Sequence, residues 1–169
     1  MTDRAWIKKL LKLNPCSEAV EYARSYETLD AAWQDCARGD WMLWLIGKRD
    51  TGETSRKRLV LAACACARTA LQYIPDGENR PLIAIETAEK WARGEEGVTL
   101  DQVRIAANAA NAGYAAYAAG YAAYAAYAAG YAAYAAGYAA YAADAAYKAA
   151  RKACADIVRK HYPKAPEGA

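Results

Sequence analysis

A tyrosine repeat in an alanine background is the feature that most restricts how this chain can fold. Residues 113–143 contain only alanine, tyrosine and glycine, and the tyrosines recur every three or four residues. That spacing matches the turn of an α-helix and not the two-residue period of a strand. Alanine has the highest helix propensity of all residues, so the repeat predicts a helix with little outside help. The tyrosines of the repeat are Tyr114, Tyr117, Tyr121, Tyr124, Tyr127, Tyr131, Tyr134, Tyr138 and Tyr141.

The same tyrosines predict a helix–helix seam. Residues 106–143 contain no Leu, Ile, Val, Trp or Phe, so only tyrosine can bury large apolar area there. We expect these rings to pack on the N-terminal helices, on a second copy of the chain or on a partner. Two alternatives stay open: the repeat could be a spacer whose length matters more than its contacts, or its rings could form a ladder on which bases stack. A stacking ladder requires basic residues beside the rings, which the repeat lacks, so nucleic acid is not the expected partner.

The remainder of the chain also predicts helices, and the fold class is therefore all-α. No segment alternates with period two, and the uncharged run from Leu59 to Ala67 indicates a central helix. We expect a multi-helix bundle over 1–98 and a disordered tail over 163–169. Between them, a long Ala/Tyr-rich helix over 99–162 is expected, bent at a glycine or packed back on the bundle. The helices expected before it span 3–13, 15–26, 28–39 with Thr28 as cap, 40–46 with Asp40 as cap, 55–73 and 80–93, and a capping box of Thr99 and Gln102 starts the last one.

Charge and cysteine content indicate a cytoplasmic protein. The formal net charge of +3 over 169 residues is too small to indicate a nucleic-acid or membrane partner. No secretory signal is recognisable, and an odd number of cysteines, five, favours reduced thiols. The uncharged run 113–143 is long enough to span a bilayer. Its nine tyrosine hydroxyls would each need a partner in hydrocarbon, so no membrane span is expected.

Residues that carry chemistry are few. His161 is the only histidine, which removes most nucleophilic and metal sites that one chain could build. The thiols of Cys64 and Cys66 lack the spacing of a zinc site, and no glycine-rich phosphate loop is present. The sequence therefore predicts no catalytic residues, no metal and no cofactor.

One aromatic cluster is a candidate binding site. Three tryptophans lie within twelve residues and indicate either core or a binding groove. Stacking rings combined with arginine would suit an anionic nucleotide. Arg68 follows the apolar run and should find a carboxylate partner, with Asp35, Asp40 or Glu86 as candidates. The candidate binding residues are Trp33, Asp35, Arg38, Asp40, Trp41, Trp44, Arg68 and Arg80.

Several stretches resemble a family of helical bacterial and phage proteins, the Imm-5-like immunity proteins. They are AAWQDCARGDWMLWL at 31–45, RLVLAACACAR at 58–68, PDGENRP at 75–81, AIETAEKWARGE at 84–95 and CADIVRK at 154–160. The resemblance covers about 28–160 in the same order. It implies a helical protein that binds and neutralises a toxin, and it brings no catalytic residues.

Three hypotheses for function follow from the sequence. The first is a non-enzymatic immunity protein that neutralises a toxin by occlusion. The second is a protein that binds a small ligand or nucleotide, such as a phage sponge for a signalling molecule. The third is a structural assembly module that associates with itself through the Ala/Tyr helix.

Overall fold

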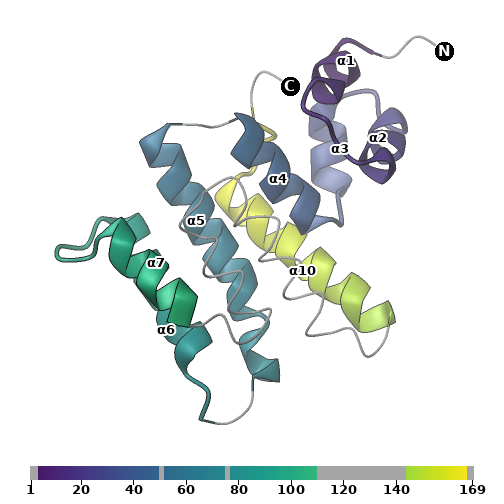
Figure 1. Ribbon diagram of the computed structural model, residues 1–169. Helices are drawn as coiled ribbons and strands as arrows, with labels where there is room; N and C mark the ends of the chain where they lie inside the picture. Colours follow the sequence, from purple (N-terminus) through teal and green to yellow (C-terminus); the bar gives the residue numbers. More distant parts are fainter. Residues whose placement is uncertain (1–3, 50–51, 75–76, 110–143, 167–169) are drawn as a thin grey trace.

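The computed structural model describes residues 4–49, 52–74, 77–109 and 144–166 (Figure 1). Every regular element in these ranges is a helix, which confirms the all-α fold class. The nine repeat tyrosines and the seam expected for them lie outside the described residues. The elements are α1 (Ala5–Leu11), α2 (Ser17–Arg24), α3 (Leu29–Asp35), α4 (Gly39–Arg49), α5 (Glu53–Arg68), a 3₁₀ turn (Leu71–Tyr73), α6 (Arg80–Arg93), α7 (Leu100–Ala109) and α10 (Asp144–His161).

Helix α5 is the centre of the bundle, as its uncharged run predicts. It packs against α6 on one side and against α4 and α10 on the other (Figure 1). Leu59, Val60 and Cys64 are completely buried along it. The helix ends at Arg68 and the chain continues through the 3₁₀ turn, so the element expected over 55–73 is two elements.

Helix α10 belongs to the same core. Cys154, Ala155 and Val158 are completely buried, and α10 packs against both α4 and α5. Helix α7 packs against α6. Both described ends of the segment expected as a long helix therefore pack against the bundle.

Helices α4 and α10 cross in very close contact at Gly39. A Cβ atom added to Gly39 would lie 2.6 Å from the Cβ of Cys154 and 2.7 Å from the backbone nitrogen of Ala155. A residue with a side chain at this position would force one of the two helices to move.

Most helix ends follow the signals in the sequence. Thr28 accepts a hydrogen bond from the Ala31 amide at 3.1 Å, and the Thr99–Gln102 capping box forms in both directions. The expectation that Asp40 caps a helix is wrong. Helix α4 already starts at Gly39, and the Asp40 carboxylate binds the Arg38 guanidinium instead, which is a charged and therefore stronger donor than a backbone amide.

The C-terminal segment holds α3 against the bundle. Trp33 donates its indole hydrogen to the Tyr162 carbonyl at 3.0 Å, and Arg159 donates to the Cys36 carbonyl at 2.7 Å. Residues 163–166, the first part of the tail expected to be disordered, continue these contacts, since Gln34 donates to the Pro163 carbonyl at 2.6 Å.

Candidate functional site

A group of aromatic side chains and one arginine gathers where α2, the turn after it and the start of α4 meet. We call Tyr22, Tyr26, Arg38, Asp40 and Trp41 the aromatic–arginine face. The Arg38 guanidinium lies 4.1 Å from the ring centre of Trp41. The Trp41 ring is 5.6 Å from that of Tyr22, which is 4.9 Å from that of Tyr26. The cation and the three rings thus form a continuous row of contacts, in which the Tyr22–Tyr26 and Tyr22–Trp41 ring pairs are tilted by 49° and 54°.

Ion pairs hold Arg38 in place. Its Nε and Nη2 atoms donate to both carboxylate oxygens of Asp40, with a shortest distance of 2.6 Å, and Nη1 reaches Glu18 at 3.3 Å. Burial would lower the pKa of Arg38, but the hydrogen bonds to Asp40 and Glu18 outweigh it and the pKa is raised. The guanidinium is therefore a fixed cation in contact with an aromatic ring.

Tyrosine hydroxyls tie the rings to the backbone and to an acidic residue. Tyr22 donates to the Ala32 carbonyl at 2.8 Å, and Tyr26 donates to the Asp35 carboxylate. Burial is the main cause that raises the pKa of Tyr22, and for Tyr26 the bond to Asp35 is the main cause. Both phenols therefore stay protonated and act as hydrogen-bond donors.

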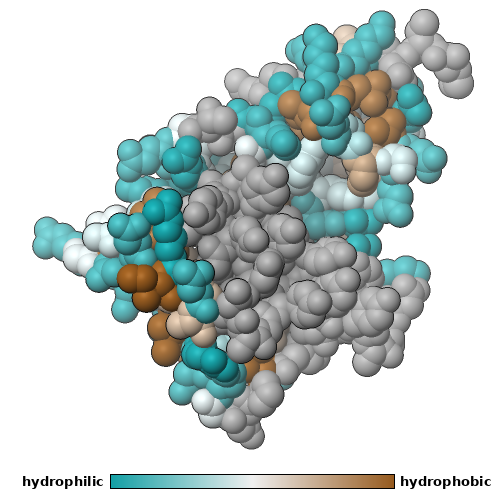
Figure 2. All heavy atoms as spheres, in the orientation of Figure 1, coloured by the Kyte–Doolittle hydropathy of each residue, from teal (hydrophilic) through white to brown (hydrophobic). Residues whose placement is uncertain are grey.

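The segment that carries most of this face is acidic. Residues 17–40 contain six acidic residues and two arginines, a formal charge of −4 within a chain of net charge +3. Five of the six acidic residues are exposed, and Figure 2 shows the hydrophilic surface at this end of the molecule with apolar atoms between. We call Glu18, Glu21, Glu27, Asp30 and Asp35 the acidic rim.

The other two tryptophans of the sequence cluster belong mainly to the core. Trp33 is only 3% exposed, and Trp44 is half-buried. The hollow among the three tryptophans has a volume of about 60 Å³ and an apolar lining. Small-molecule sites usually measure about 300–1,000 Å³, so this hollow is too small for a nucleotide.

Arg68 and Arg80 lie away from this cluster. Arg68 forms two hydrogen bonds of 2.8 Å with Glu89, which corrects the expected partners Asp35, Asp40 and Glu86. Glu86 is exposed, whereas the Glu89 side chain is only 13% exposed on the side of α6 that meets Arg68. Arg80 pairs with Glu78, two residues before it. Neither arginine lines the hollow at the tryptophans.

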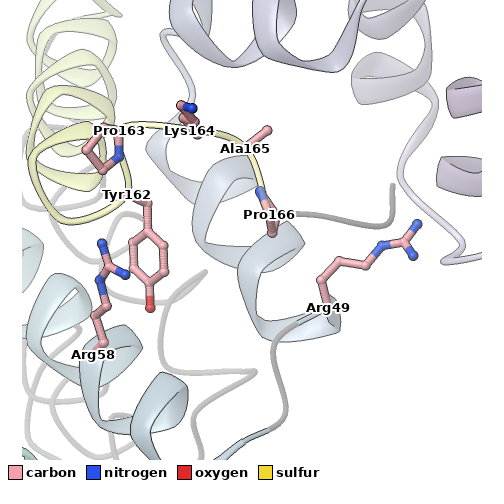
Figure 3. A pocket seen from close by; sticks show the side chains of 7 residues that line it. All are labelled: Arg49, Arg58, Tyr162, Pro163, Lys164, Ala165 and Pro166. Carbon is pink, nitrogen blue, oxygen red and sulfur yellow. The ribbon is translucent and has the colours of Figure 1, made fainter.

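A larger cavity of about 540 Å³ lies between the end of α4, the start of α5 and residues 162–166 (Figure 3). Arg49, Arg58 and Lys164 line it. The sequence does not predict this cavity, because its three cations come from separate segments and no local motif joins them.

The cysteines and the histidine have no arrangement typical of a reactive site. All five thiols are free, with Cys16 exposed and the others buried. Burial raises the pKa of Cys36 and of Cys64. Burial, together with the nearby charge of Arg58, lowers the pKa of His161. In the described ranges no three His, Cys, Asp or Glu side chains come together as metal ligands would, and no helix there has the length and apolarity to cross a membrane.

Comparison of the chain with known proteins finds no matching family model, no matching curated protein and no matching solved structure. The resemblance to Imm-5-like immunity proteins therefore stays a prediction.

Proposed function

We propose that this protein is a non-enzymatic, cytoplasmic immunity protein that neutralises a toxin by direct binding, and that the aromatic–arginine face makes the contact. The observation that carries the proposal is the stack of Arg38 on Trp41, held by Asp40 and flanked by Tyr22. Tryptophan, tyrosine and arginine are the residues most enriched at the energetic centres of protein interfaces. The family resemblance points to the same kind of function.

The ordering of these side chains favours tight binding. A side chain that is already fixed loses little conformational entropy when a partner covers it, whereas immobilising a free one costs about 0.5–1.5 kcal/mol. Arg38 is fixed by two carboxylates, and both tyrosines are fixed by hydrogen bonds. The face therefore meets a partner in its bound conformation.

The acidic rim favours a basic partner. The segment 17–40 carries a formal charge of −4, of which Glu27 is paired with Arg4, and its aromatic rings are half-buried. Such a segment attracts a positively charged protein surface and repels an acidic one. Rim charges act mainly on the association rate and depend on salt. We therefore expect the toxin to present lysines or arginines around an apolar contact.

Co-expression with the products of adjacent genes tests this proposal. A toxin among them should stop growth when expressed alone, and this protein should restore growth and form a complex with it. Trp41→Ala and Arg38→Ala should abolish protection.

Matched controls lie on the opposite part of the bundle. Trp91→Ala removes another half-buried tryptophan, and Arg68→Ala breaks another arginine–carboxylate pair, both away from the face. These variants should protect like the wild type. If no adjacent gene product is neutralised or bound, or if the controls lose protection as fully as Trp41→Ala does, the proposal is wrong.

A further inference from the structure

The cavity between α4, α5 and residues 162–166 has a cationic lining that the proposed function does not use. Arg49 ends α4, Arg58 lies in the first half of α5, and Lys164 follows α10. No carboxylate is among the described residues that line it. In Figure 3, Arg58 lies beside the ring of Tyr162, and Arg49 extends from α4 on the other side of Pro166. Two guanidinium groups thus lie on two sides of the same short segment.

Arg49 has two hydrogen-bond donors that no described residue accepts. Arg49 is half-buried as a residue, but its Nε and Nη2 atoms are buried and make no hydrogen bond within the part of the chain that the structure describes. Buried donors without an acceptor are costly, because they have lost their hydrogen bonds to water. An anion in the cavity would supply the missing acceptor.

Arg58 is already oriented at the other side. It donates to the His161 carbonyl and lies 4.3 Å from the ring centre of Tyr162. The stack on Tyr162 and the bond to His161 limit the rotamers of Arg58. Its guanidinium is still exposed, so further donors can face a ligand. Lys164 adds an exposed, flexible charge.

We propose that this cavity binds a phosphate-bearing small molecule. The planar fork of a guanidinium matches two phosphate oxygens, and three cations suit an anion that carries two or more charges. The volume of about 540 Å³ falls within the usual range for small-molecule sites. Pro163, Ala165 and Pro166 provide an apolar wall for the rest of the ligand. Because three cations line the cavity, the more highly charged pyrophosphate should bind better than a single phosphate.

Titration with inorganic phosphate, pyrophosphate and ADP tests the site, with sodium chloride at equal ionic strength as reference. Isothermal calorimetry and thermal melting of the full chain are the measurements. Pyrophosphate and ADP should bind more tightly than phosphate and raise Tm with concentration, whereas chloride should not. Binding of ADP but not pyrophosphate would assign recognition to the nucleoside and overturn the role given to the arginines.

Arg49→Gln is the decisive variant, and Lys48→Gln is its matched control. Lys48 is exposed on the same helix and does not line the cavity. Arg49→Gln should weaken pyrophosphate binding at least tenfold, and Lys48→Gln should leave it unchanged. Without ligand, Arg49→Gln should melt at or above the wild-type Tm, since no hydrogen bond of Nε or Nη2 is lost.

Three results would overturn the proposal: no binding of any probe, equal binding by wild type and Arg49→Gln, or a ligand-free Arg49→Gln protein that melts well below wild type. The last would mean that Arg49 has a partner within the chain. None of these measurements involves a toxin, so they stand apart from the test of the proposed function.

Discussion

Replacing Gly39 by alanine tests the crossing of α4 and α10 that closes the bundle. The added Cβ would lie 2.6 Å from the Cβ of Cys154 and 2.7 Å from two backbone atoms of α10, the nitrogen of Ala155 and the carbonyl carbon of Cys154. A side chain can rotate away from such a contact, but a helix backbone cannot. The two helices must therefore separate or shift along each other.

The sign of the effect distinguishes this site from an ordinary helical glycine. In an open helix, glycine to alanine gains up to about 1 kcal/mol of stability. Overpacking a close-packed site costs about 1–3 kcal/mol instead. For a chain of this size each kcal/mol shifts Tm by roughly 2–4 °C, so Gly39→Ala should lower Tm by roughly 2–12 °C.

Thermal and urea unfolding followed by circular dichroism measure this change. The matched control is Gly52→Ala at the N-cap of α5, where the added Cβ meets only the Ser55 hydroxyl oxygen at 3.9 Å. Losing glycine at a cap should cost no more than about 1 kcal/mol. A Gly39→Ala protein as stable as wild type, or more stable, would refute the close crossing of α4 and α10.

Three further predictions concern the core, the thiols and the response to pH. Ala63→Asp should unfold the protein, because Ala63 is 1% exposed on α5 and an unpaired buried carboxylate costs several kcal/mol. A folded variant with the wild-type Tm would show that α5 is not central. A thiol reagent should label one cysteine quickly in the native protein, the exposed Cys16, and five after denaturation; more than one fast thiol would contradict the buried positions of the rest. The pKa of His161 lies below its usual 6.5 in the folded protein. The imidazole therefore binds a proton at higher pH in the unfolded chain than in the folded one. The free energy of unfolding should fall as the pH drops below about 6.5. In urea unfolding measured at several pH values, His161→Gln should remove this loss of stability. A variant with the same dependence of stability on pH as wild type would contradict the role given to His161. Below about 4.5 a second loss should follow, since hydrogen bonds from Arg68 and Arg159 lower the pKa values of Glu89 and Asp156.

Local signals in the sequence predict most of the helices correctly. The Thr28 cap, the Thr99–Gln102 capping box and the left-handed Gly94 after α6 all depend on residues a few positions apart. The central position of α5 also follows from its own uncharged run, since a helix without a polar face can only be buried. These features are decided within one element.

The candidate sites depend on contacts between segments that are far apart in the sequence, and no local sequence pattern predicts such contacts. Arg38 and Trp41 lie three residues apart, so their proximity could be predicted, whereas the contribution of Tyr22 comes from another helix. The partner of Arg68 could not be predicted, because Glu86 and Glu89 differ only in which side of α6 they occupy. The cavity at Arg49 forms from three segments and leaves no local pattern at all.

Calorimetric titration of the purified protein with its toxin partner, which measures the dissociation constant, tests the proposed function most directly. With a toxin partner from an adjacent gene, wild-type protein should bind more weakly at 300 mM than at 50 mM salt, because the acidic rim contributes through exposed charges. Trp41→Ala should weaken binding by at least about thirtyfold at both salt concentrations, which corresponds to the 2 kcal/mol or more of a hot-spot residue. Equal affinities for wild type and Trp41→Ala, without salt dependence, would contradict binding through the aromatic–arginine face.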